Sequence, residues 1–376
     1  MEKMKRVGIT DPHGFLGRHI RWSLLPKKDQ IEVVEIPVSL LHGNADALSA
    51  LVKNCDVLVH VASAHPRNTP DEKDIYPTNT GFARALTDAC DASGVSPHII
   101  FASSTHIHSD TAYGTSKKDA GTHFRTWGAA RQAPVTNLII PNEFGEGGKP
   151  FDVSFVSTFC HQLARSERSE VSSDASVALI HAQEVAHAVY EVIVNPAPGD
   201  IELPGTQIAV AEVYSILRDF HGQYSNDIVP VLTDRMHTAL FNTLRYHLWE
   251  NGFYPRPLQL KSDARGALFD IVKEKTGGQT FMSTTEPGKT RGEHYHTRKI
   301  ERFCVLQGSG TIRLRKVLED TVFSYDVSGE SPAYIDMPTF VTHDITNTGN
   351  VPLLTAFWCN EILDLSDSDT YQLPVV

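Results

Sequence analysis

The rhythm of apolar segments changes near residue 250, and this change constrains the fold more than any other feature of the sequence. Before it, strand-like runs alternate with helix-length segments; the runs are Arg6 to Thr10, Ile31 to Val38, Asp56 to Ser63, His98 to Ser103 and Val135 to Ile140. After it, short runs such as Phe303 to Leu306 and Leu353 to Trp358 follow one another with turn residues between them. The first pattern predicts a doubly wound α/β domain with a parallel sheet, and the second predicts an antiparallel all-β barrel or sandwich. We therefore predict two domains, residues 1–248 and 249–376, with a linker around Pro255 and Pro257.

Composition excludes several classes of partner. The 34 Lys and Arg residues against 45 Asp and Glu residues give a formal net charge of −11, which argues against nucleic acid or an anionic membrane. Five cysteines without a CxxC pair suit a reducing compartment. No signal-peptide pattern opens the chain, and no run approaches the roughly 18 apolar residues of a membrane span. We expect a cytoplasmic protein.

A short loop after the first predicted strand is a candidate dinucleotide site. Gly14 and Gly17 resemble the later glycines of the GxxGxxG fingerprint of extended short-chain dehydrogenases/reductases (SDRs), with Phe15 and Leu16 between them, whereas Asp11 replaces the first glycine. A carboxylate there would repel phosphate and requires a backbone conformation that glycine adopts more easily. These five residues are either a cofactor loop or an ordinary tight turn between strand and helix.

Tyr113 and Lys117 form a YxxxK pair, which a helix places on one face. A nearby ammonium lowers the pKa of a phenol, so this pair can move a proton to or from a carbinol oxygen, although such a pair is also common on protein surfaces. Ser103-Ser104-Thr105 precedes it. The SDR resemblance implies that Thr105, Tyr113 and Lys117 are catalytic, and that the strand with Ala62 flanks the nicotinamide.

The choice of cofactor rests on few residues. Glu35 lies where an acidic residue would bind a ribose hydroxyl of NAD, and no Lys or Arg lies between Ile31 and Lys53 to bind a 2′-phosphate. We predict NADPH or NADH. The segment Pro141 to Gly145 resembles the SDR substrate loop, although Ile139 stands where an Arg is often found. His181 lies in a segment that resembles another part of the SDR family, and it is either a residue of that motif or a structural residue.

The second half carries a metal-ligand pattern. Gly288, His294, His296, Glu301 and Gly308 match the spacing of the first cupin motif, and the Pro338 to Asn347 segment resembles the second motif, with Phe340 in place of its glycine and His343 as the final ligand. Two histidines two residues apart on a strand face the same side. We predict that His294, His296, Glu301 and His343 bind a divalent metal, with Zn as the first choice and Fe, Mn or Ni as alternatives.

An extended SDR fused to a cupin resembles the bifunctional CapF-type enzymes of capsular polysaccharide synthesis. The resemblance implies C3 epimerisation of a UDP-4-keto-6-deoxy-N-acetylhexosamine by the cupin domain, NAD(P)H reduction at C4 by the SDR domain, a path to UDP-N-acetyl-L-fucosamine, and a homodimer formed through the cupin. Asp263 and Arg265 are candidates for the cupin pocket or an ordinary surface pair. Two other readings stay open: a metal cupin oxygenase or isomerase on an SDR scaffold, and a non-catalytic nucleotide-sensing or scaffold protein.

Overall fold

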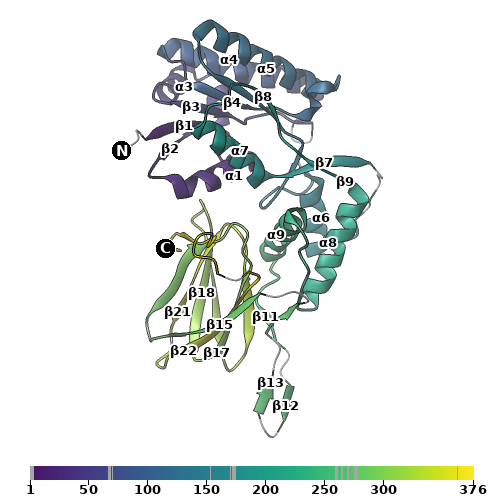
Figure 1. The fold of residues 1–376 in the computed structure, drawn as a ribbon, viewed down its shortest axis with the longest axis vertical. Coiled ribbons are helices and arrows are strands. Elements are labelled where there is room, and N and C mark those ends of the chain that lie inside the picture. The colour runs from purple at the N-terminus through teal and green to yellow at the C-terminus, as the bar shows by residue number, and fades with distance from the viewer. Residues whose placement is uncertain are drawn as a thin grey trace. The chain divides into compact units, whose positions relative to one another are not determined.

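The structure is a computed structural model that describes residues 4–66, 69, 71–152, 154–169, 171, 175–258, 261–263, 266–268, 271–274, 278–361 and 363–376. The chain forms two compact units (Figure 1). One comprises Met1–Thr158 and Asp174–Val210, and the other Phe159–Ser173 and Ala211–Val376. The domain boundary at 248/249 stays a prediction. No helix in the described ranges is long and apolar enough to cross a membrane.

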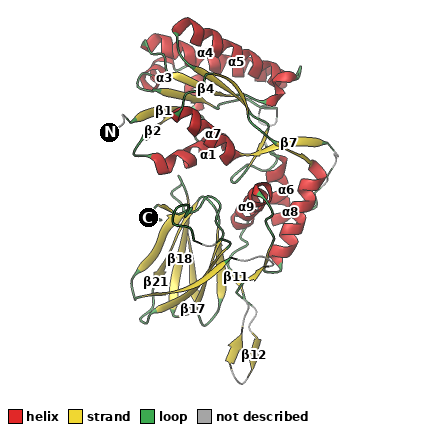
Figure 2. Ribbon diagram, in the orientation of Figure 1, coloured by secondary structure: helices red, strands yellow, loops and turns green. Residues whose placement is uncertain are grey.

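A six-stranded parallel sheet is the framework of the first unit (Figure 2). Its order is β2-β1-β3-β4-β5-β8, and the strands are β1 (Lys5–Thr10), β2 (Ile31–Ile36), β3 (Val57–His60), β4 (His98–Ala102), β5 (Val135–Ile139) and β8 (Gly199–Glu202). The chain builds β2 on one side of β1 and then returns to the other side with β3. This reversal is the place where open α/β sheets bind ligands. The predicted doubly wound α/β fold is confirmed.

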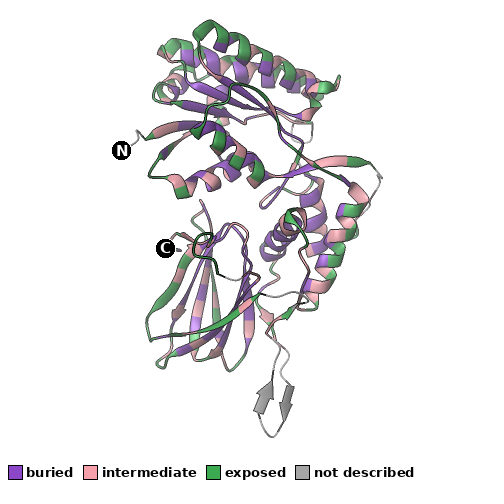
Figure 3. Cartoon of the chain, in the orientation of Figure 1, coloured by how far each residue is buried: buried purple, intermediate pink, exposed green. Residues whose placement is uncertain are grey.

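Helices cover both faces of this sheet. The core on one face includes residues from α1 (Phe15–Leu24) and α7 (Ala182–Val194). The core on the other face includes residues from α3 (Ala45–Val52), α4 (Ile75–Ser93) and α5 (Ala112–Arg131). Strands β3 and β4 are buried along their whole length, as expected for a sheet covered on both sides (Figure 3).

Smaller elements complete the first unit. Strand β6 pairs parallel with β7, and β7 pairs antiparallel with β9. The bounds are β6 (Asn142–Phe144), β7 (Ser176–His181), β9 (Thr206–Ala209), α2 (Val38–Leu41), and the 3₁₀ turns η1 (Leu25–Lys27), η2 (Glu72–Asp74) and η3 (Thr105–His108). Helix α6 (Phe155–Ala164) crosses from the first unit into the second.

Two five-stranded sheets dominate the second unit, and all neighbouring strands within them pair antiparallel. One has the order β11-β20-β17-β22-β15, with β11 (Arg256–Pro257), β20 (Ala333–Met337), β17 (Glu301–Gln307), β22 (Leu353–Cys359) and β15 (Gln279–Thr285). The other has the order β19-β18-β21-β16-β23, with β19 (Val322–Ser328), β18 (Ser309–Lys316), β21 (Val341–Asn347), β16 (Thr290–Tyr295) and β23 (Tyr371–Gln372). This architecture confirms the predicted cupin-like barrel.

The predicted linker around Pro255 and Pro257 is wrong. Arg256 and Pro257 form β11, which pairs with β20 at the edge of a sheet. Proline is tolerated there because an edge strand does not need every backbone N–H. Short pairs β10 (Ile228–Val229) with β14 (Lys273–Glu274), and β12 (Lys261–Asp263) with β13 (Gly266–Leu268), also lie in this part of the chain.

Two long helices belong mostly to the same unit as the barrel: α8 (Val210–Ser225) and α9 (Arg235–Glu250). Every residue from Leu240 to Trp249 in α9 is buried. The Trp249 ring meets Phe323 of β19 edge to face, with centroids 5.3 Å apart. A helix buried on all sides is part of the core rather than a surface cover.

Candidate active site and metal centre

The loop after β1 keeps the shape of a glycine-rich turn without its first glycine. Asp11 has a φ of 51°, the left-handed conformation that the sequence predicted for this position. Side chains at Gly14 or Gly17 would overlap the Asp11 carboxylate or its carbonyl oxygen, so the loop is closely packed on Asp11. Burial raises the pKa of the Asp11 carboxyl, although the Gly14 backbone N–H hydrogen bonds to it.

A pocket of about 370 Å³ opens at the carboxyl ends of the parallel strands. Its walls include Asp11, Gly14, Phe15, Leu16, Val61, Ser63, Ala102, Ser103, Tyr113, Lys117, Ile140 and Glu143. Gly17 and Ala62, also predicted to bind the cofactor, are buried and do not line the pocket. The Ala62 backbone N–H donates to the Thr10 hydroxyl at 3.0 Å, and this bond ties the end of β3 to the end of β1. The pocket thus collects most of the predicted cofactor residues at the topological switch.

Tyr113 and Lys117 both line this pocket from the first turns of α5, which the Thr111 hydroxyl caps. The Lys117 ammonium is buried and donates to the Ala102 carbonyl oxygen at 2.9 Å. Burial lowers the pKa of Lys117 to about 8. Burial, reinforced by the charge of Glu143, raises the pKa of Tyr113 to about 12, although hydrogen bonds with Ser63 and Ser104 act in the opposite direction.

Two hydroxyls lie beside the phenol, one from Ser63 and one from Ser104 of the Ser103-Ser104-Thr105 run. Thr105 begins η3, and its backbone N–H donates to the Ile140 carbonyl oxygen at 3.0 Å. The pocket wall includes Ser103 but neither Ser104 nor Thr105, and of these three residues Ser104 is the one whose hydroxyl hydrogen bonds with Tyr113. The catalytic role of Thr105 stays a prediction, and Ser104 is the better placed candidate. A run of three consecutive hydroxyl residues does not show which one contacts Tyr113, so the sequence could not distinguish Ser104 from Thr105.

Glu35 at the end of β2 is paired with two basic groups. Its carboxylate lies 2.5 Å from a guanidinium nitrogen of Arg21 and 3.1 Å from Nε2 of His13. Both partners come from the loop and helix before β2, outside the Ile31 to Lys53 segment on which the cofactor prediction rested. His13 also lines the pocket.

The loop that follows β6 is held by a buried carboxylate–imidazole contact. Glu146 is wholly buried, and its Oε2 lies 3.0 Å from Nε2 of His181. His19 from α1 hydrogen bonds to the Glu146 carbonyl oxygen at 2.9 Å. Arg18 donates to the Gly147 carbonyl oxygen at 3.0 Å, and Gly147 lines the pocket. These contacts make His181 a structural support of the pocket wall, which no sequence spacing indicated.

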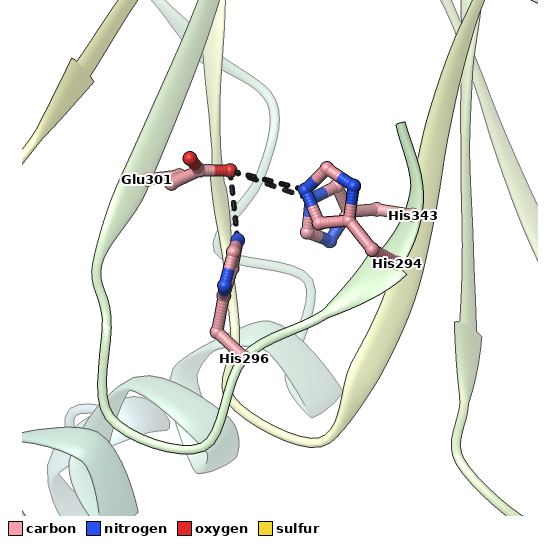
Figure 4. A group of neighbouring side chains, drawn as sticks. All are labelled: His294, His296, Glu301 and His343. Carbon is pink, nitrogen blue, oxygen red and sulfur yellow. Dashed lines mark hydrogen bonds and ion pairs between the residues drawn. The ribbon is translucent and has the colours of Figure 1, made fainter. Parts of the chain in front are cut away.

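Four predicted ligands meet in the barrel. His294, His296, Glu301 and His343 each offer an atom, and these atoms lie within 4.8 Å of one another (Figure 4). Glu301 Oε2 lies 2.9 Å from Nε2 of His296, 3.5 Å from Nε2 of His343 and 3.7 Å from Nε2 of His294. Burial favours the protonated Glu301, but hydrogen bonds with the three imidazoles hold its pKa well below the usual range.

Neighbouring groups orient the imidazoles. Nδ1 of His296 donates to the Asp369 carbonyl oxygen at 2.6 Å, which leaves Nε2 turned to the cluster. Nε2 of His343 is buried and faces Glu301 Oε2 across 3.5 Å, a distance too long for a strong hydrogen bond, so this nitrogen can serve as a metal ligand. The three imidazoles and one carboxylate therefore fit a divalent metal.

The candidate pair Asp263 and Arg265 cannot be placed at this centre. Arg265 lies outside the described residues, and Asp263 is described as part of β12 without its side chain.

Comparison with known proteins gives the family. The model of the NAD dependent epimerase/dehydratase family matches residues 12–203. The chain belongs to this family. The model of the polysaccharide biosynthesis C-terminal domain matches residues 261–371. A UDP-2-acetamido-2,6-beta-L-arabino-hexul-4-ose reductase of Pseudomonas aeruginosa is 30% identical over 375 residues, which cover 98% of this chain and 99% of that protein.

Solved structures agree with this assignment. The capsular polysaccharide assembling protein CapF of Staphylococcus aureus is 26% identical, with a TM-score of 0.62 over 98% of this chain and 99% of that chain. The UDP-N-acetylglucosamine 4-epimerase of Methanobrevibacter ruminantium M1 has a TM-score of 0.56 over 66% of this chain and 100% of that chain, and at 17% identity it supports the fold alone. The CapF-type resemblance predicted from the motifs is confirmed.

Proposed function

We propose that this family member is a bifunctional sugar-nucleotide enzyme. Its cupin domain, residues 249–376, would epimerise C3 of a UDP-4-keto-6-deoxy-N-acetylhexosamine. Its SDR domain, residues 1–248, would reduce the C4 ketone, on the path to UDP-N-acetyl-L-fucosamine. The single observation that carries the proposal is the pocket that joins Tyr113 and Lys117 to the dinucleotide loop in a chain that also holds the four-residue metal cluster.

In the reductase step, the protein binds, orients and protonates the sugar. A bound dihydronicotinamide would supply the hydride for C4. Tyr113 gives its phenolic proton to the O4 oxygen, and Ser104 or Thr105 holds that oxygen by a hydrogen bond. Lys117 places a positive charge near the phenolate that Tyr113 leaves behind.

In the epimerase step, the C4 ketone makes the neighbouring C3 proton removable, because the developing charge is an enolate. A side chain of the barrel removes that proton, and a proton returns to the opposite face of the ring. A divalent metal held by His294, His296, Glu301 and His343 would supply a Lewis acid in this site.

The cofactor in this proposal is NADPH or NADH. Glu35 offers a carboxylate to a ribose 2′-hydroxyl. Arg21, which pairs with Glu35, offers a positive charge to a 2′-phosphate, and His13 offers a ring nitrogen as a hydrogen-bonding group. Binding of both dinucleotides should be measured by calorimetry. Arg21→Gln should weaken NADPH binding and leave NADH binding within about twofold.

The decisive experiment incubates the protein with such a keto sugar nucleotide and NADPH in heavy water. Deuterium should enter at C3, and the ketone at C4 should be reduced. Tyr113→Phe should abolish reduction but keep the exchange at C3, whereas His294→Ala should abolish the exchange. His187→Ala, at an exposed histidine, is the matched control and should keep both steps.

No exchange at C3 together with no consumption of NADPH or NADH would refute the proposed function. Oxygen uptake with bound iron would instead favour the oxygenase reading. The proposal includes a homodimer formed through the barrel, and a monomer in sedimentation analysis would contradict that part.

A further inference from the structure

Glu143 is an acidic residue of the reductase pocket for which the mechanism above has no role. It is the middle residue of β6, and it lines the same pocket as Tyr113 and Lys117. Its Oε1 atom is buried and has no hydrogen-bond partner within the described part of the chain. A buried carboxylate oxygen without a partner is costly, so its presence beside the two catalytic candidates needs an explanation.

Lys117 needs a counter-charge. Its ammonium is buried, and its hydrogen bond goes to the Ala102 carbonyl oxygen, which is a neutral acceptor. Burial alone disfavours the charged ammonium, and the carboxylate of Glu143 acts against that effect. Lys117 in turn affects Glu143. Burial raises the pKa of Glu143 to about 7, and the positive charge of Lys117 limits that rise.

Other charges surround the same groups. The remaining charged or titratable residues of the pocket wall are Asp11, His13, Arg18, His65, Lys149 and Asp152. A second cavity behind Lys117 adds His108, Asp110, Lys118, Asp119, Arg125 and Asp200. His60 is buried, and its pKa is lowered by burial and by Lys117. Glu143 is the carboxylate whose charge bears on both Tyr113 and Lys117.

We propose that Glu143 is a positioning residue that serves as the counter-charge of the Tyr113–Lys117 pair, and that it extends to higher pH the range in which the Lys117 ammonium and the Tyr113 phenol both keep their protons. The proposal rests on the reductase part of the proposed function. In that step C4 gains a hydride, the Tyr113 O–H bond breaks and its proton forms the new O4–H bond. Both Lys117 and Tyr113 must therefore carry their protons before each turnover.

Removing the charge of Glu143 changes the pKa of both partners, Lys117 and Tyr113, in the same direction. Without its negative charge, the pKa of Lys117 falls further and the pKa of Tyr113 also falls. In Glu143→Gln, the alkaline decline of kcat/KM should therefore begin at a pH lower by about one unit, a change typical of one nearby charge. Glu143→Asp, which keeps the charge, should retain most of the original range.

A second measurement does not depend on turnover. The rate at which acetic anhydride modifies Lys117 in the cofactor-free protein, followed by mass spectrometry across pH, reports the fraction of uncharged amine. Its midpoint should move to lower pH in Glu143→Gln and stay near the original value in Glu143→Asp. Glu202→Gln removes the same charge at an exposed position of β8 and should change neither measurement.

The two measurements separate the two proposals. If Glu143→Gln leaves the Lys117 midpoint unchanged, the role proposed for Glu143 is wrong whether or not the enzyme turns over. If the midpoint moves as expected but the unaltered protein reduces no keto sugar nucleotide, the counter-charge is supported and the proposed function fails.

Discussion

Asp11 and Phe340 share one backbone conformation, with φ values of 51° and 58°, although they belong to different motifs. Each stands where its motif usually has glycine. A non-glycine residue in this region costs on the order of 1 kcal/mol or more, so surrounding contacts must maintain both turns. The two motifs have therefore lost a glycine while the backbone has kept the turn that the glycine normally allows.

Asp11→Gly should tighten dinucleotide binding by about tenfold, because it removes a negative charge that faces the phosphates and frees the Gly14 N–H. Calorimetric titration with NADPH and NADH measures the change. Asp11→Asn separates the two effects, since it removes the charge and keeps the side-chain size. Equal or weaker binding in both variants would show that Asp11 does not face the phosphates. Failure of every variant to bind would favour the non-catalytic reading.

Gly17→Ala should disrupt the same loop, because a Cβ at this position would overlap the Asp11 carbonyl oxygen. We expect a loss of dinucleotide binding and about 1–3 kcal/mol of stability, typical of overpacking. Gly81→Ala in α4 is the matched control, since apart from its chain neighbours and the backbone of its own helix no atom of the described chain lies within 4 Å of the added Cβ. That control should be neutral or stabilise the protein by about 0.5–1 kcal/mol, because alanine is the better helix former. Similar losses in both variants would contradict the proposed packing.

Arg302 and Asp336 form a fully buried two-point ion pair, with distances of 2.7 and 3.0 Å. Asp336→Asn should lower the free energy of unfolding by about 3–5 kcal/mol, because it leaves the Arg302 charge unpaired in the core. Chemical denaturation measures this loss. The exposed pair Arg125 and Asp200, at 2.9 Å, is the control, and Asp200→Asn should cost at most about 1 kcal/mol.

Lys117 should make stability depend on pH. Its pKa is about 8 in the folded protein, below the usual value near 10.5, because burial disfavours the ammonium. The unfolded chain therefore holds this proton more tightly, and stability should rise as pH increases from about 8 to 10.5. The total effect is roughly 3 kcal/mol. Lys117→Met should remove this contribution from denaturation curves, whereas Lys118→Met, at an exposed neighbour, should retain it.

Metal removal should destabilise the second unit. We expect one divalent ion per chain by elemental analysis, and a chelator should lower the melting temperature. An ion at about 100 times its Kd stabilises the folded state by about 2.7 kcal/mol. Glu301→Ala should abolish both the bound ion and the chelator effect, whereas His187→Ala should keep both. A full complement of metal in Glu301→Ala would remove Glu301 from the ligand set.

Short-range patterns in the sequence predicted much of the fold. Apolar runs located five of the six parallel strands, all except β8, and barrel strands such as β17 and β22, because burial on one or both faces fixes their period. The Pro255 to Pro257 segment was misjudged, since proline marks both linkers and edge strands. Ser104 was missed because three consecutive hydroxyl residues give no signal of which one reaches Tyr113.

The sequence by itself determined those side-chain directions that depend only on the local geometry of a helix or a strand. The four-residue spacing of Tyr113 and Lys117 places them on one face of α5, and the two-residue spacing of His294 and His296 keeps their imidazoles together, although His296 lies one residue beyond the end of β16. Only the tertiary structure decided which residues far apart in the sequence lie together. Examples are Glu143 and Lys117 in one pocket wall, His181 with Glu146, and Arg302 with Asp336. Helix and strand periods set the direction of neighbouring side chains, but contacts between distant segments depend on how whole sheets and helices pack, and no local pattern records that packing.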